Sequence, residues 1–147
     1  MEALMGIRLG NDHLLWVKIG AAAAVPVLGQ GDLSIKRGAK SIDTSSKTSG
    51  GWDTSAGGNR TGSATLKLNP ELPDAGYTAF ETVGKSAPPQ NFGIEVRKGG
   101  LDGTEDDTVF ACTVWCGDFN DDYPKDGVVS LDTTFNFAGA PTVDTLK

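Results

Sequence analysis

The sequence predicts a mainly β fold, built from two packed antiparallel sheets as a sandwich or partly open barrel, with one flanking α-helix. Apolar and polar residues alternate over several short runs, which is typical of strands with one buried face. Twenty of the 147 residues are glycine, as expected for a protein with many turns. Only one segment has the spacing and the cap of a helix. The length favours a single domain over residues 1–147.

The expected strands follow one another along most of the chain. Pro26 cannot donate a hydrogen bond to a central ladder, so the short apolar piece around it is expected at a sheet edge. The segment from Thr108 to Phe119 differs from the others because it is apolar on both faces, and a strand of that kind is covered on both sides. The remaining strand patterns cover residues 13–19, 33–37, 40–46, 62–68, 92–97 and 128–137.

One helix is predicted after Pro73, which ends the preceding segment. Asp74 is a favourable N-cap residue. Tyr77, Phe80 and Val83 then recur at three-residue spacing and define one apolar face. Glycine and proline between residues 84 and 88 end the pattern. We therefore expect this helix to lie against a sheet.

The charge balance argues against nucleic-acid binding. The net charge is −6, and no cluster of Lys and Arg suitable for holding phosphates appears in the sequence. No run approaches the ~18 apolar residues of a membrane span. The alanine-rich run 19–28 follows Lys18 and a leader with acidic residues, unlike a secretory signal. The chain is expected to be made in the cytosol and to have no membrane partner.

No catalytic, cofactor or metal site is predicted. The single histidine, His13, lies in an apolar run and is interpreted as structural. Cys112 and Cys116 are interpreted as small buried side chains, because four residues of strand hold them about 13 Å apart, too far for a disulfide. The series Asp118, Asn120 and Asp122 opens like a calcium loop but has neither the later glycine nor the bidentate glutamate.

The segment from Asp43 to Ser63 is the most unusual part of the chain. Of its 21 residues, 17 are Ser, Thr, Gly, Asn or Asp, so it cannot form a core of its own. It nevertheless carries Trp52, whose large apolar ring is costly to leave in water. Either the body of the domain or a neighbouring molecule is expected to cover this ring.

The order of these features resembles a known family. An opening strand and a Gly-Gln-Gly-Asp turn precede the series Ile-Asp-Thr-Ser-Ser-Lys-Thr-Ser-Gly-Gly-Trp at 42–52, and an alternating strand, one helix and closing strands follow. This pattern is similar to that of the major tail tube proteins of long-tailed, non-contractile bacteriophages and related gene transfer agents. The resemblance covers roughly residues 13 to 139, and its specific part is the 42–52 series.

The resemblance implies a structural virion protein of tail-tube fold that is not an enzyme. Six subunits would form a ring, and rings would stack into a tube through which DNA is ejected into the bacterial host. A tape-measure protein and tail terminator or tip proteins would be the other partners. Six copies at −6 give −36 per ring, so DNA would pass without specific binding. Residues 1–12 and 138–147 would be terminal arms, and 47–60 a long loop between subunits.

Two sets of residues are candidates for roles in such a tube. Lys47, Gly50, Gly51, Trp52 and Asp53 are expected to contact the neighbouring subunit or the adjacent ring, with Trp52 as the apolar anchor. The alternative is that Trp52 folds back onto its own sheet. Candidates for the polar channel face are Asp43, Ser130, Asp132 and Thr134, although a solvated outer face accounts for the same residues.

A second function class is an extracellular β-sandwich module that binds glycans through exposed tryptophans. Such modules present aromatic rings on one platform. Trp16 and Trp115, however, lie in apolar strands and are expected to be buried. Rings or tubes of the purified protein would support the first interpretation, and a glycan-binding monomer would support the second.

Overall fold

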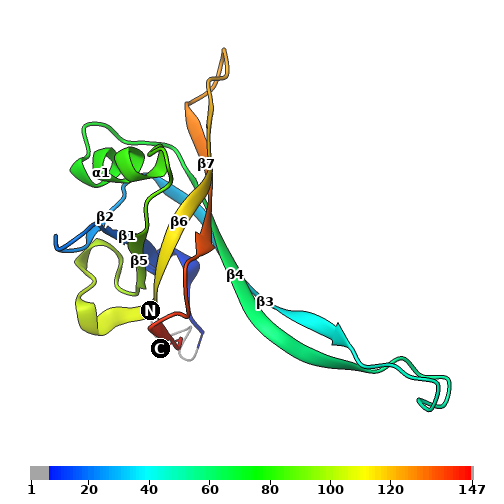
Figure 1. The fold of residues 1–147 in the computed structure, drawn as a ribbon. Helices are drawn as coiled ribbons and strands as arrows, with labels where there is room; N and C mark the ends of the chain where they lie inside the picture. Colours follow the sequence, from blue (N-terminus) through cyan, green and yellow to red (C-terminus); the bar gives the residue numbers. More distant parts are fainter. Residues whose placement is uncertain (1–6, 147) are drawn as a thin grey trace.

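The computed structural model describes residues 7–146, and within them it contains eight strands and one α-helix. All eight strands belong to one antiparallel sheet, with the order β2-β1-β5-β6-β7-β4-β3 and β8 paired to β6. The sheet curves without closing, which corresponds to the open-barrel form of the prediction (Figure 1). The strands are β1 (Leu14–Lys18), β2 (Val25–Pro26), β3 (Gln30–Asp43), β4 (Ser55–Leu68), β5 (Phe92–Arg97), β6 (Thr108–Asp122), β7 (Ser130–Phe137) and β8 (Val143–Asp144).

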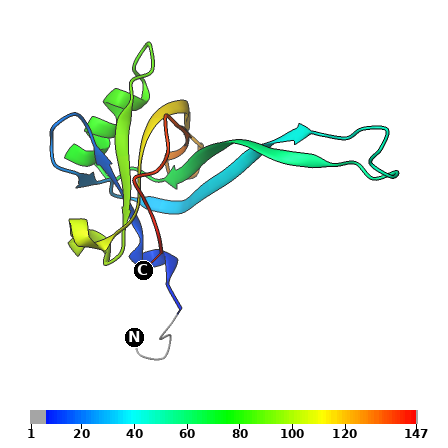
Figure 2. The same cartoon turned by 60° about the horizontal axis from the view of Figure 1, so that its bottom comes forward.

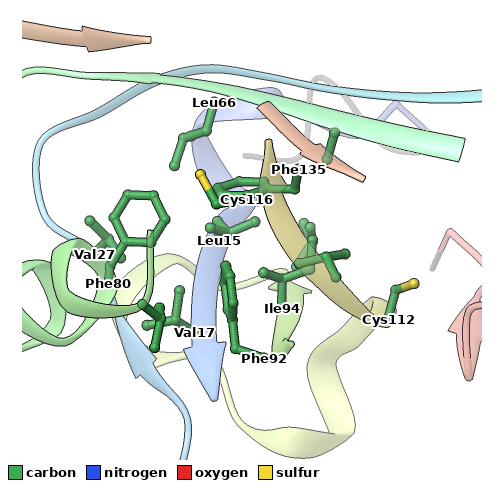
Figure 3. Packing of buried hydrophobic residues seen from close by; sticks show 14 of the residues in the cluster. Leu15, Val17, Val27, Leu66, Phe80, Phe92, Ile94, Cys112, Cys116 and Phe135 are labelled. Atoms are coloured by element: carbon green, nitrogen blue, oxygen red, sulfur yellow. The ribbon is translucent and has the colours of Figure 1, made fainter. Parts of the chain in front are cut away.

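The helix α1 (Ala75–Gly84) covers the apolar face of the curved sheet (Figure 1). Its predicted face is confirmed, because Tyr77, Phe80 and Val83 are all buried. The Phe80 ring is fully buried, and its centroid lies 5.6 Å from that of Phe135 and 6.5 Å from that of Phe92. Figure 3 shows these rings packed together with Leu15, Leu66 and other core residues. Aromatic pairs in edge-to-face geometry therefore join the helix to the sheet.

The end of β6 departs from the prediction. Strict alternation along the segment from Thr108 to Phe119 would place Phe119 on the face opposite Cys116, but a register shift between Cys116 and Asp118 changes the alternation. Phe119 consequently lies beneath α1, with its ring centroid 5.5 Å from that of Phe80. A β-bulge inserts one extra residue and so turns every later side chain to the other face.

A side chain joins the two sides of the open sheet. The Gln30 amide accepts a hydrogen bond from the Leu15 N–H (2.9 Å) and donates one to the Leu15 carbonyl (2.7 Å). It also donates to the Val27 carbonyl at 2.8 Å. Gln30 therefore satisfies backbone groups of β1 in the way that a neighbouring strand would, and it holds β3 next to β1.

The two ends of the chain are described in part. Residues 10–12 form a short 3₁₀ turn, whereas residues 1–6 of the expected N-terminal arm and Lys147 lie outside the described residues. Residues 138–146 run back along the sheet, where β8 pairs with Phe110 and Ala111 of β6. Whether either end contacts another subunit stays a prediction.

The cap of α1 supports a first prediction, on stability. The Asp74 carboxylate accepts hydrogen bonds from the N–H groups of Gly76 (3.1 Å), Tyr77 (3.2 Å) and Leu28 (3.0 Å). Asp74→Ala leaves these donors without their partner, so we expect the free energy of unfolding in urea to fall by about 1–2 kcal/mol. Thr82→Ala on the exposed side of the same helix is the control and should change it by less than about 0.5 kcal/mol. Equal effects of the two substitutions would contradict this account of the cap.

Candidate functional site

The most prominent feature of the molecule is a long two-stranded hairpin, here called the β3–β4 arm and comprising residues 38–61. β4 pairs with β7 only over Ser63–Leu68, whereas its pairing with β3 continues to Ser55. Beyond the β7 ladder the two strands have no third strand beside them, and they extend far from the body of the domain (Figures 1 and 2). The residues of the arm are almost all exposed.

Hydroxyl groups order the tip of the arm, which comprises residues 44–54. The Thr54 N–H donates to Ser45 Oγ at 2.7 Å, and the Thr44 and Thr54 hydroxyls lie 2.8 Å apart. The Ser45 N–H donates to the Asp43 carboxylate at 2.8 Å, and this hydrogen bond lowers the pKa of Asp43. Serine and threonine therefore supply local hydrogen bonds in a segment that has no core.

Two glycines form the turn that precedes Trp52. Gly50 and Gly51 have φ values of 70° and 86°, in the left-handed region that favours glycine. The Trp52 N–H donates to the Ser49 carbonyl at 3.3 Å, which ends the turn. Trp52 is 80% exposed, so the alternative that its ring folds back onto its own sheet is wrong. The physical reason is that the paired strands of the arm carry the tip away from the domain (Figure 2).

The structure places the predicted inter-subunit residues together, whereas it separates one of the predicted channel-facing residues, Asp43, from the other three. Lys47, Gly50, Gly51, Trp52 and Asp53 all lie exposed at the arm's tip. Ser130, Asp132 and Thr134 alternate along β7 on the face opposite the core, where Asp132 is paired with Lys67 and Asn120. Asp43 is not beside them, because it lies at the far end of β3 opposite Ser55.

The burial of the other two tryptophans was predicted correctly in one case only. Trp16 is 8% exposed, and the Arg97 guanidinium lies 4.4 Å from the centroid of its ring. Trp115 is 36% exposed, so its expected burial is wrong. It is paired with Asn136 on the polar face of β6, where no helix covers the sheet.

A groove lies at the base of the arm, between its first residues and the segment 138–144. This arm-base groove has a volume of about 830 Å³. The Arg37 guanidinium binds the Asp144 carboxylate at its rim, with Nε 2.8 Å from Oδ2, and this hydrogen bond raises the pKa of Arg37. Sequence patterns did not indicate the groove, because residues far apart in the chain form it. The lining includes Arg37, Arg60, Trp115, Phe137, Pro141 and Asp144.

The two cysteines and the histidine lie apart from these surfaces. Cys112 and Cys116 are unpaired and buried in the core; Cys116 points toward Leu66, and Cys112 lies at the margin of the cluster (Figure 3). The Nδ1 atom of His13 lies 2.8 Å from the Leu9 carbonyl oxygen. Over residues 7–146, no group of three or more His, Cys, Asp or Glu side chains could hold a metal ion. No helix in that range is long and apolar enough to cross a membrane.

An exposed arm with an apolar tip, extending from a domain with a buried hydrophobic core, is typical of a structural protein that assembles with other molecules. Residues 8–143 match the family model for phage tail tube proteins. The chain therefore belongs to the phage tail tube protein family and is a structural component of a tail tube. A search of curated proteins gave no match.

Solved structures with the same fold include tail tubes from several systems. The tail of an empty gene transfer agent particle, determined with C6 symmetry, aligns over 95% of this chain and 100% of its own at 17% identity, with a TM-score of 0.73. The SPP1 tail tube aligns over 95% of this chain and 81% of its own at 12% identity, with a TM-score of 0.70. The sheath–tube complex of an extracellular contractile injection system aligns over 96% of this chain and 95% of its own at 10% identity, with a TM-score of 0.62. The predicted fold and family are confirmed.

Burial of the thiols supports a second prediction. Desolvation raises the pKa of Cys116 to about 11 and also raises the pKa of Cys112. At pH 8, below the pKa of Cys116, about one Cys116 thiol in a thousand is in the reactive thiolate form, and the raised pKa of Cys112 likewise favours its protonated form. We expect slow alkylation by iodoacetamide in native buffer and rapid alkylation of both cysteines in urea, measured by mass spectrometry. Rapid reaction in native buffer would disprove the buried placement.

The exposure of Trp52 supports a third prediction, for the free subunit. Trp52→Ala should change the free energy of unfolding of the monomer by less than about 0.5 kcal/mol, because the ring has no packing to lose. Trp16→Ala, which removes a buried ring, should lower it by about 3 kcal/mol or more. Both values are measured by urea denaturation below the concentration at which the protein assembles. A large loss for Trp52→Ala would show that the ring packs within its own chain.

Proposed function

We propose that this protein polymerises as stacked hexameric rings into the tail tube, and that the arm contacts the neighbouring subunit or the adjacent ring. The observation that carries the proposal is the exposed Trp52 at the tip of an arm with no core of its own. Large apolar rings that are costly to expose act as anchors when a partner covers them. The C6 symmetry of the gene transfer agent tail, which has the same fold, supports six subunits per ring.

The polar face of the sheet is proposed to line the channel. It carries Ser130, Asp132 and Thr134, and in the same face Asp118 is paired with Thr134. A net charge of −6 per subunit gives −36 per ring of six, which repels phosphates and lets DNA pass without specific contacts. Asp43, at the end of the arm, would then act between subunits rather than in the same patch of channel wall. The tube would surround a tape-measure protein and end at terminator or tip proteins, and it would carry no catalytic activity.

The test is assembly of the purified protein, followed by electron microscopy. The unmodified chain should form rings or tubes at high concentration. Trp52→Ala should remain a folded monomer and need about tenfold or more protein to form tubes, since a central apolar anchor is worth roughly 1.4 kcal/mol or more. Trp52→Phe keeps a large apolar ring and should assemble nearly as well as the unmodified chain. Normal tubes from Trp52→Ala would remove the anchor role of this residue.

A further inference from the structure

The arm-base groove has room for a large side chain because small residues form much of its wall. Ala138, Gly139 and Ala140 line it, and a Cβ atom added at Gly139 would meet nothing within 4 Å. The ring of Phe137, which also lines the groove, lies against Gly62, where an added Cβ would come within 2.3 Å of the ring. The absence of a side chain at Gly62 therefore makes room for the Phe137 ring in the wall of the groove.

The chemistry of the groove suits an aromatic ring with acidic neighbours. Phe137, Pro141 and the partly exposed Trp115 supply apolar surface. Two guanidinium groups, those of Arg37 and Arg60, lie in the lining with only one carboxylate, that of Asp144. The groove thus carries a local charge of +1. A guanidinium stacks favourably on the face of an indole, particularly where water is excluded.

The tip of the arm has the matching chemistry. It presents Trp52, which is 80% exposed. Asp43 and Asp53 outweigh Lys47, so the segment 43–54 carries a charge of −1. The other exposed hairpin tip, residues 122–129 between β6 and β7, carries Tyr123, Val128 and Val129. With its flanking strand residue Asp122 counted in the same way, it also carries a charge of −1. Both tips therefore match the charge of the groove, and the larger and more exposed ring favours the tip with Trp52 as the occupant.

The tip cannot reach the groove of its own chain. The ladder from Gly38 opposite Thr61 to Asp43 opposite Ser55 separates the two by about 20 Å of paired strand. Figures 1 and 2 both show the arm leading away from the segment 138–144, coloured red at the end of the chain. An occupant from this protein must therefore come from another copy.

From these observations we infer that Trp52 of one subunit inserts into the arm-base groove of another subunit, with Arg60 of that groove against the indole and Asp53 near its guanidinium groups. The inference rests on the proposed function and adds the receiving surface. Donor and acceptor lie on different parts of the chain, so the contact is heterologous and can repeat from subunit to subunit.

The test is cross-linking within assembled protein. In the double variant Asp53→Cys and Ala140→Cys, oxidation should link the tip of one subunit to the groove of the next and give a ladder of covalent multimers on non-reducing gels. The matched control carries Val128→Cys and Ala140→Cys, which places the first cysteine at the other hairpin tip, and it should give no ladder. A ladder from the control alone would overturn the inference and assign the groove to the β6–β7 tip.

A second variant fills the groove without touching the tip. Gly139→Trp should leave the free energy of unfolding nearly unchanged, because the site has open space, and should raise the concentration needed for tubes by about tenfold or more. Gly139→Ala, which leaves the groove open, is its control. If Gly139→Trp forms normal tubes and the double variant gives no tip-to-groove cross-link, the docking of Trp52 in the groove is wrong. The proposed function would still stand. If the unmodified chain forms no rings or tubes, the proposed function itself is wrong.

Discussion

The length of β4 compared with that of its neighbour β7 determines the shape of this molecule. β4 has fourteen residues, but only the last six are paired with β7, and its remaining residues have β3 as their one neighbour. An isolated two-stranded hairpin is marginally stable in water because it buries little apolar surface. The arm is nevertheless ordered by cross-strand hydrogen bonds and by hydroxyl groups at its tip. The body of the domain provides the fixed end from which this ribbon extends.

Much of the body could be predicted from the sequence because its signals are local. Asp74 at the helix start and the spacing of Tyr77, Phe80 and Val83 define α1 without reference to any other segment. Alternation along 62–68, 92–97 and 128–137 likewise identifies strands and their buried faces. The unusual composition of the segment 43–63 was also evident, since seventeen polar or small residues surround a single large ring, but the sequence left open whether Trp52 folds back onto its own sheet.

The remaining features depend on contacts that no local pattern contains. One bulge after Cys116 places Phe119 under the helix, whereas Trp115, which precedes the bulge, lies exposed on the face opposite the core. The direction of the arm follows from where β7 ends, and β7 lies about seventy residues later in the chain. Residues 138–146 have no alternating pattern because backbone pairing with β6 and the ion pair between Arg37 and Asp144 hold them. The groove at the arm's base exists only once these separate segments have met.

The placement of the cysteines has a consequence for a particle that leaves the cell in which it is made. Free thiols are stable in a reducing cytoplasm, but outside it they are exposed to oxidants that form disulfides between chains or sulfenic acids. In this protein both cysteines are buried: Cys116 points toward Leu66 (Figure 3), and the Cys112 thiol lies 3.6 Å from the Gly139 carbonyl oxygen. The subunit can therefore use cysteine as a small core residue without making the assembled particle sensitive to thiol oxidation. Packing within each subunit thus protects the two thiols from oxidants for as long as the particle is outside the cell.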